Sequence, residues 1–600
     1  MPPYRWVIII FCTLAYFASP IEAKADDQPR RHIIGLYCRD DLRGLVLEEV
    51  LKTEGIPYFR LRDLSHLEKS GLRGLVLGEG CEDATPAIER FLNGGGTLLV
   101  LKPAGSTAKL MGLAQVGSQQ DGYLNLQGKA AKLVSYEGRL QLFGQSNRYQ
   151  GGETLAALDG EGGFGGLIRI RRGSGAAIVA AFDLTTTLLK LMQPESECGK
   201  AVDASHVEYE LGDAPQADLL RRLLINTLLD QIDIPVLRKW YFPSQHRAML
   251  MVLGDQDGAN FAQLSIVLEL MKELRTPYTL YVTPTDQPLS RDQFDILAQG
   301  GMDFALHPDY VSGGRRFTKE EFDKQRKKAE ADLARRLTGT RSHSLRWGSV
   351  RDAPAWAAEA GLQYDATLGP RWWPSKPPKL GYWQGTGLPF YFFDDDQARR
   401  MDLLEIPTAG IDNQDFWTKP NYTVSYKTEV TRTFVAGCSL TEDAAFEMMK
   451  RTLDQAADQY HTIIGYCWHP CYLAARAMNR TSIYPTDVHF RKCIQYAKNR
   501  GIGLSGSNAL NEFWRAREKV RIIPTAWDRA SATAQFGISS DSRLDDLTVI
   551  IPLWFDHRKA EVFVHGRSVA YREESLWGSH FAMFALEVGP QEIPITVRYR

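Results

Sequence analysis

Three short clusters of acidic and histidine residues each follow an apolar run in the middle of this sequence. They are Asp255-Gln256-Asp257, His307-Pro308-Asp309 and Trp468-His469-Pro470. Carboxylates and imidazoles are common ligands of divalent metal ions, and both also transfer protons near neutral pH. If the clusters met in space, they could bind a metal ion and move protons during a hydrolysis.

The apolar runs before these clusters predict buried parallel strands. Residues 248–253 are almost continuously apolar, which is typical of a strand buried on both faces. Apolar residues at helical spacing predict a helix over 261–274, and further strands are expected at 278–282, 304–306 and 463–466. This alternation indicates a (β/α) barrel, in which the carboxyl ends of the strands meet on one face.

The motifs in this region resemble those of the polysaccharide deacetylase family, the NodB-homology fold. The resemblance covers 247–516 and rests on five stretches: Asp255-Gln256-Asp257-Gly258, Gly301 to His307, Leu345-Arg346-Trp347-Gly348, Gly361 to Leu368, and Trp468-His469-Pro470. They are similar to the family's Asp-pair motif, the approach to its His motif, its Arg-x-Pro motif, the strand after that, and its closing His motif.

The resemblance implies an enzyme that removes acetyl groups from N- or O-acetylated polysaccharides with the help of a divalent metal, with zinc expected. By the same resemblance Asp255 would be the general base and His469 the general acid. Asp257 and His307 would be metal ligands, and Arg346 would orient Asp255.

One metal ligand of the family pattern is missing. The family's second motif has two histidines four residues apart, but the residue four after His307 is Val311. Asp303, Asp309 and His469 are the candidates for a third ligand. Two ligands hold a metal less tightly than three, so the sequence leaves open a catalytically reduced glycan-binding or assembly protein that uses the barrel as a scaffold. A glycoside hydrolase is a further alternative, with Asp255 paired with Asp257 or with Asp395.

Aromatic residues in a long insertion after residue 364 are candidates for substrate binding. Trp372, Trp373 and Trp383 stand among prolines and glycines there. Such rings stack on sugars when they are exposed at the mouth of a barrel, and they form a core cluster when they are buried.

Two further domains are expected beside the barrel. Residues 31–236 alternate strands and helices, which predicts a flavodoxin-like α/β domain, and its 94–100 and 178–184 stretches resemble class I glutamine-amidotransferase-like domains. Cys81 follows a strand there but lacks the nucleophile-elbow pattern, so we interpret it as a structural cysteine. Residues 520–600 show strand alternation without helical periodicity, which predicts a β-sandwich.

The amino-terminal residues and the overall charge limit the location and the partners. Residues 1–25 have the pattern of a signal peptide, so we expect an exported protein that is periplasmic, secreted or at the cell surface. Membrane contact is expected only through this segment if it stays uncleaved. A net charge of −1 gives no reason to expect nucleic acid as a partner. Cys467-x-His469-x-Cys471 lacks the second cysteine pair of a structural zinc site, which favours buried thiols or a local disulfide.

Overall fold

The computed structural model describes residues 33–600, except for 66, 68–69, 82–84, 194–205, 286–288, 311–314, 371–378, 417–421, 427–429, 435–437 and 481–483. The predicted signal peptide, Val311, Trp372 and Trp373 therefore lie outside the described residues. In the part of the chain that is described, no helix combines the length and the apolar character needed to cross a membrane.

The amino-terminal part is built on a nine-stranded mixed sheet. Five strands are parallel, in the order β2 (Tyr58–Arg60), β1 (Ile34–Tyr37), β3 (Gly74–Leu77), β4 (Thr97–Leu101) and β9 (Gly175–Ala180). Four antiparallel strands extend the sheet: β8 (Gly165–Arg172), β7 (Glu153–Leu158), β5 (Ala114–Leu126) and β6 (Gly138–Gln150). The sequence predicts β1, β3, β4 and β9, which are apolar runs, but neither β2 nor the antiparallel extension.

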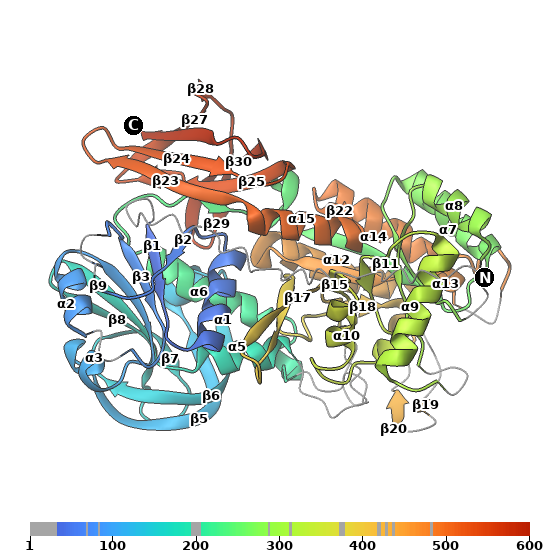
Figure 1. Ribbon diagram of the computed structural model, residues 1–600, viewed down its shortest axis with the longest axis horizontal. Coiled ribbons are helices and arrows are strands. Elements are labelled where there is room, and N and C mark those ends of the chain that lie inside the picture. Colours follow the sequence, from blue (N-terminus) through green and yellow to red (C-terminus); the bar gives the residue numbers. More distant parts are fainter. Residues whose placement is uncertain are drawn as a thin grey trace, which may run out of the picture.

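Helices accompany this sheet, as the alternating pattern predicts. They are α1 (Asp41–Thr53), α2 (Thr85–Asn93), α3 (Gly105–Leu110), α4 (Gly128–Lys132), α5 (Leu184–Met192) and α6 (Gln216–Leu229). Helix α6 is buried along nearly its whole length and runs toward the central part of the molecule (Figure 1). Its Asp218 accepts hydrogen bonds from Thr386 and from the Gly387 backbone, so it joins the amino-terminal part to the barrel.

The central part is a curved ten-stranded sheet. Its order is β16 (Phe390–Asp394), β17 (Arg399–Glu405), β15 (Tyr364–Asp365), β14 (Gly339–Thr340), β13 (Asp303–Leu306), β12 (Thr279–Val282), β11 (Met249–Asp255), β21 (Ile463–Cys467) and β18 (Gly410–Ile411), with β22 (Gly503–Ser505) also beside β11. All neighbouring pairs are parallel except β16 with β17. Within the described residues no ladder joins β16 to β18, so the barrel is open.

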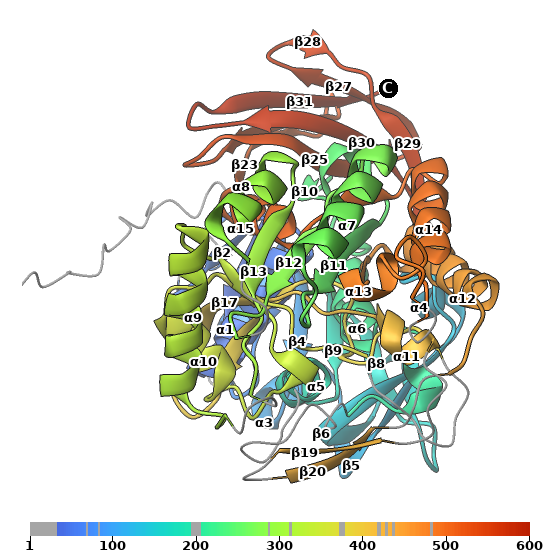
Figure 2. The same cartoon turned by 90° about the vertical axis from the view of Figure 1, so that its right-hand side faces the viewer.

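Helices cover the outside of this sheet, as Figure 2 shows for α7, α8, α9 and α14. They are α7 (Phe261–Leu274), α8 (Arg291–Gln299), α9 (Lys319–Leu333), α10 (Ala353–Glu359), α11 (Asp412–Phe416), α12 (Glu442–Gln455), α13 (Pro470–Leu473), α14 (Asp487–Asn499) and α15 (Ser507–Lys519). Helix α7 coincides with the predicted 261–274. Asn260 and Gln263 form a capping box that satisfies backbone donors at its start, which explains why the helix begins there.

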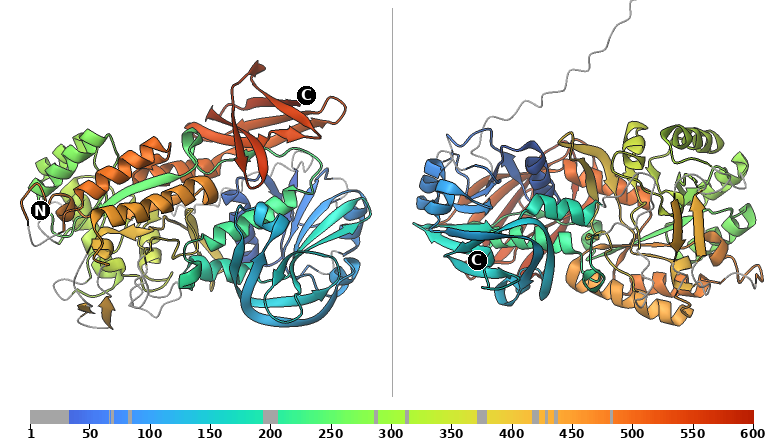
Figure 3. Two further views of the ribbon diagram at one scale, coloured as in Figure 1. Left: turned by 180° about the vertical axis from the view of Figure 1, so that it is seen from behind. Right: turned by 90° about the horizontal axis from the view of Figure 1, so that it is seen from below.

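The carboxyl-terminal part consists of two antiparallel sheets. One contains β25 (Leu544–Pro552), β30 (Ser579–Val588) and β29 (Arg572–Leu576), and the other contains β23 (Arg521–Asp528), β24 (Thr533–Ser539), β31 (Ile593–Tyr599), β27 (Arg558–Val564), β26 (Trp554–Phe555) and β28 (Arg567–Ser568). The first sheet also includes β10 (Arg238–Lys239), which comes from the segment before the barrel. Both sheets lie across the other two parts at one side of the molecule (Figure 3).

Candidate metal and catalytic centre

The acidic and histidine side chains predicted from the sequence meet at the carboxyl ends of the barrel strands. Asp255 ends β11, Asp257 follows it, His307 follows β13, and His469 follows β21. His307 Nε2 lies 3.2 Å from Asp257 Oδ1, and His469 Nε2 lies 3.3 Å from Asp257 Oδ2. His307 Nδ1 lies 3.8 Å from Asp255 Oδ1. Four side chains that follow or end three strands therefore form one cluster at the carboxyl end of the barrel.

The structure adds His343, which the sequence analysis does not single out. His343 stands three residues after β14, and its Nε2 lies 3.7 Å from Asp257 Oδ1. One ligand atom each from Asp257, His307 and His343 lies within 4.8 Å of the other two. His343 thus supplies a third ligand atom, and it follows β14, the next strand along the sheet from β13.

The two imidazoles of this group are oriented by their other ring nitrogens. His307 Nδ1 lies 2.6 Å from the Arg341 carbonyl oxygen, to which it donates, and His343 Nδ1 lies 2.8 Å from Asp309 Oδ1. Both Nε2 atoms therefore face Asp257, as in metal sites whose histidines are fixed by outer partners. Asp309 holds His343 in place and is not itself the third ligand.

This donor set fits a divalent metal ion. Asp257 Oδ1 and His307 Nε2 are buried, and neither makes a hydrogen bond within the protein. Buried polar atoms of this kind are rare unless something outside the protein chain satisfies them. Two imidazole nitrogens and one carboxylate oxygen are ligands that suit zinc and leave a position open for a reactant. The side chains of Asp257 and His343 are 27% and 22% exposed, so the group is open to solvent.

The loop after β11 is held in a strained conformation that aims Asp257. Asp257 has φ 40°, a left-handed conformation that costs a non-glycine residue free energy and is often found at functional sites. Gln256 anchors the loop, because its backbone N–H donates to the Tyr281 carbonyl and its side-chain oxygen accepts from Thr283 N–H. Gly254 is required just before, since a Cβ there would lie 1.7 Å from the Tyr278 hydroxyl.

Arg341, not Arg346, is the partner of Asp255. Arg341 Nε lies 3.1 and 3.2 Å from the two carboxylate oxygens of Asp255. The guanidinium of Arg346 lies instead over the ring of Phe317, 4.9 Å from its centroid. Arg341 directly follows β14 and so reaches the strand ends, whereas Arg346 follows a short 3₁₀ turn that carries it away. The prediction that Arg346 orients Asp255 is therefore wrong, and Arg341 takes that place.

Charges around the two aspartates keep both of them ionised. Burial would raise the pKa of Asp255, but Arg341, His307 and His469 outweigh it and lower that pKa below its usual value. Burial would also raise the pKa of Asp257, but His343, His307 and His469 hold it well below its usual range. Neither carboxyl is therefore suited to be the protonated acid that a glycoside hydrolase needs.

Asp412 supports His469 from the first turn after β18. His469 Nδ1 lies 2.5 Å from Asp412 Oδ1, and the His469 backbone N–H donates to Asp412 Oδ2 over 2.7 Å. Burial would lower the pKa of His469, but Asp412 and Asp257 raise it well above its usual value. At neutral pH His469 is thus a protonated imidazole whose Nε2 points at the centre. Sequence analysis missed Asp412 because β18 is only two residues long.

A second group of possible ligands, Asp255, Cys467 and His469, is less suited to a metal. Arg341 already holds Asp255 as an ion pair, and its positive charge would repel a cation placed there. Burial raises the pKa of the Cys467 thiol well above its usual value, so the thiol stays neutral. Cys467 and Cys471 are both free cysteines, which excludes the local disulfide considered from the sequence.

Three other residues predicted as site residues lie elsewhere. Asp303 begins β13, about 13 Å along the strand from His307, and so lies at the opposite end of the barrel from the ligands. Asp395 lies at the β16–β17 turn, where Arg351 is 3.0 Å from it, and is not paired with Asp255. Trp383 is buried at 1% exposure and stacks on Tyr209 with 5.9 Å between ring centroids, so it is a core residue and no sugar platform.

Comparison with known proteins gives likenesses to solved structures only. No family model matches the chain, and no curated protein matches it. The structure of Agd3, described as a novel carbohydrate deacetylase, is 10% identical over 94% of this chain and 98% of its own, with a TM-score of 0.41. A probable polysaccharide deacetylase from Pseudomonas aeruginosa PAO1 is 12% identical over 46% and 93%, with a TM-score of 0.32. Puue allantoinase is 12% identical over 46% and 93%, with a TM-score of 0.33. We base the functional proposal on the residues of the site.

Proposed function

We propose that this chain is an exported, metal-dependent hydrolase that removes acetyl groups from a polysaccharide. The observation that carries the proposal is the meeting of an Asp257–His307–His343 ligand set with Asp255 and His469, which lie beside it. A third ligand from β14 removes the reason to prefer a scaffold without activity. The glycan as substrate class follows from the motif resemblance, and export follows from the amino-terminal segment.

Asp257, His307 and His343 would hold the metal ion. A divalent ion bound there supplies a Lewis acid that polarises the acyl carbonyl and makes a water molecule more acidic. Asp255 is poised to take the proton of the attacking water, because Arg341 keeps its carboxylate ionised and fixed. Its position beside His307 Nδ1, at 3.8 Å, puts it next to the ligand set without making it part of that set.

His469 would act as the general acid. Its Nε2 lies 3.3 Å from Asp257 Oδ2 and 3.9 Å from Asp255 Oδ2, whereas His343 approaches the other carboxylate oxygen of Asp257. It can donate its proton to the departing amine or alcohol, while Asp412 stabilises the protonated ring and fixes its orientation. Asp255 accepts one proton from the attacking water and the His469 imidazolium donates another to the leaving group, so the reaction balances; proton exchange with solvent then restores both residues.

Acetate release from acetylated oligosaccharides tests the proposal. We expect the purified chain to release acetate from N-acetylglucosamine oligomers or from O-acetylated glycans. A chelator should abolish the release and added zinc should restore it, since the three ligands hold the ion reversibly. Metal-bound protein that releases no acetate from either class of substrate would contradict the proposed reaction.

The pH dependence tests the role of Asp412. Because the pKa of His469 is raised, the acid is active below that raised pKa and is lost as the pH rises through it. Asp412→Asn removes the main charge that raises the pKa, so the alkaline limb of kcat should move to lower pH by about one unit or more. The acid limb, which reports Asp255, should stay where it is. An unchanged alkaline limb would mean that His469 is not the acid.

A further inference from the structure

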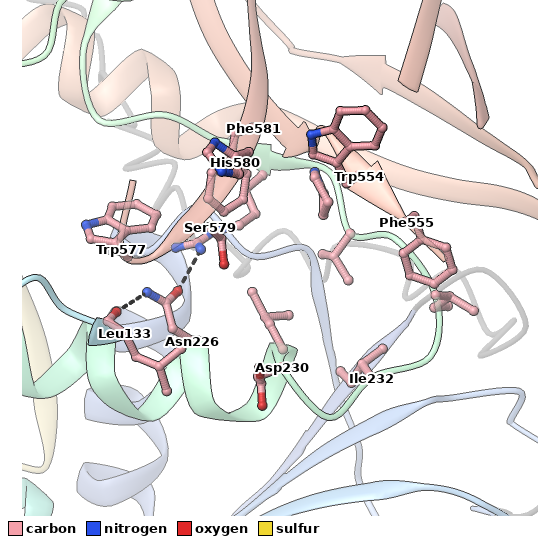
Figure 4. Close-up of a pocket in the computed structure, with 15 residues that line it drawn as sticks. Leu133, Asn226, Asp230, Ile232, Trp554, Phe555, Trp577, Ser579, His580 and Phe581 are labelled. Atoms are coloured by element: carbon pink, nitrogen blue, oxygen red, sulfur yellow. Dashed lines mark hydrogen bonds between the residues drawn. The ribbon is translucent and has the colours of Figure 1, made fainter. Parts of the chain in front are cut away.

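A cavity lies on the side of the barrel that faces away from the metal centre. It has a volume of about 370 Å³, opens to solvent, and is lined by α6, the segment 230–238 and the carboxyl-terminal sheets (Figure 4). Trp577 in its wall contacts His461 with 5.9 Å between ring centroids, and His461 precedes β21 whereas His469 follows it. β21 alone spans roughly 16 Å. The cavity is therefore remote from the catalytic residues.

Aromatic side chains form one wall of this cavity. Trp554 and Phe555, which make up β26, stand at its opening, and Trp577 and Phe581 lie deeper (Figure 4). Trp554 is 50% exposed, and it is the one exposed tryptophan in the part of the chain that the structure describes. A half-exposed indole beside a cavity leaves a large apolar face open to solvent, which favours contact with a ligand.

Polar groups lie at the same opening. Ser579 and His580 are exposed. Asp230 lines the cavity at the end of α6, but its carboxylate is already paired with Lys129 and accepts from Gln231 over 2.6 Å. The floor is polar but already satisfied, since Arg238 donates to Asn226 over 2.9 Å and Asn226 donates to the Leu133 carbonyl over 2.7 Å. His580 Nδ1 lies 3.0 Å from Ser575 Oγ, so the exposed Ser579 hydroxyl and His580 Nε2 are the rim groups that can make new hydrogen bonds.

We propose that this cavity is a binding site for a pyranose residue of a glycan chain. A pyranose presents C–H groups on its faces and hydroxyls around its edge, which matches an aromatic wall with acceptors and donors at the rim. The volume lies in the range of small-ligand sites, about 300–1,000 Å³. The site requires only that the chain binds a glycan, and it does not depend on the proposed deacetylation.

Fluorine NMR of the full chain labelled with 5-fluorotryptophan tests this site directly. The Trp554 signal is identified by its absence in Trp554→Phe. Pentamers of β-1,4-linked N-acetylglucosamine and of β-1,4-linked glucose are the probes. We expect the Trp554 signal to shift saturably with at least one of them. The same shift is expected in Asp257→Ala, because the catalytic centre lies at the other end of the barrel.

Variants of Trp554 then show how much this side chain contributes to the affinity for the glycan. Affinity at this site, measured by calorimetry in the Asp257→Ala background, should fall about tenfold in Trp554→Ala and stay within about threefold in Trp554→Phe, which keeps an aromatic face. Ile296→Ala on α8, another half-exposed apolar residue, is the matched control and should change nothing. A Trp554 signal that neither pentamer shifts at millimolar concentration, or an unchanged affinity in Trp554→Ala, overturns the proposal. Loss of acetate release with the Trp554 shift retained would affect only the proposed reaction.

Discussion

Replacing His343 with alanine is expected to abolish stoichiometric metal binding and to lower the rate of acetate release by about 10³-fold or more. His343 contributes one of three ligand atoms that lie within 4.8 Å of one another, and its removal leaves only Asp257 and His307. Metal analysis after gel filtration, together with acetate release, measures both effects. The fold should survive, because the His343 side chain is 22% exposed and fills no core.

Two further variants show whether the loss comes from the ligand itself. Asp309→Asn should weaken metal binding by about 10- to 100-fold, because Asp309 is not a ligand but orients His343 through a 2.8 Å hydrogen bond, while its other oxygen pairs with Arg315. Asp303→Asn should bind metal like the parent protein, since Asp303 lies at the other end of β13. If Asp303→Asn lost the metal while His343→Ala kept it, the assigned ligand set would be wrong.

Replacing Asp255 with asparagine is expected to lower kcat by about 10²- to 10⁴-fold while the metal stays bound. The substituted amide would keep the shape of the side chain but could not take a proton from water. The ion pair with Arg341 would also be lost, which leaves a buried guanidinium without its carboxylate and should lower the stability by a few kcal/mol. Steady-state kinetics with metal analysis and thermal unfolding of the same sample separate these effects.

Asp395→Asn is the matched control for this variant. Asp395 is the alternative carboxyl of the glycoside hydrolase hypothesis, but it lies on the β16–β17 turn next to Arg351. Its replacement should leave kcat, metal content and stability unchanged. A loss of activity in Asp395→Asn equal to that in Asp255→Asn would revive that hypothesis and contradict the assignment of the base.

The parts of the centre that the sequence predicts are those that follow long apolar strands. β11 and β21 are buried over seven and five residues, so their runs stand out and the polar residues after them can be aligned with a strand end. β14 and β18 are two residues each, Gly339–Thr340 and Gly410–Ile411, and give no such run. The residues they place, Arg341, His343 and Asp412, therefore cannot be found by periodicity.

The type of a residue and its local sequence do not show whether its side chain is buried, and burial decides whether a tryptophan can bind a sugar. Trp383 stands in a proline- and glycine-rich insertion that suggests an exposed loop, yet it packs against Tyr209 of the amino-terminal part. Gly212 comes so close that a Cβ there would lie 2.3 Å from the indole ring. Such contacts join segments that are about 170 residues apart, and no local pattern encodes them. The same holds for the exposed Trp554, whose cavity is built from four separate stretches of chain.

The pairing of the short strand β10 limits where the chain can be truncated and which of its parts recombination can exchange. Arg238 and Lys239 pair with Ile550 and Val549, and the Lys239 backbone N–H donates to the Gly55 carbonyl. Two residues before the barrel therefore bond to both the amino-terminal and the carboxyl-terminal parts. An expression clone that stops near residue 520 would remove β25, the partner of β10, and also Trp577, whose ring contacts Trp240 and Tyr241. Recombination between genes would meet the same obstacle, and the three parts are expected to be exchanged together or not at all.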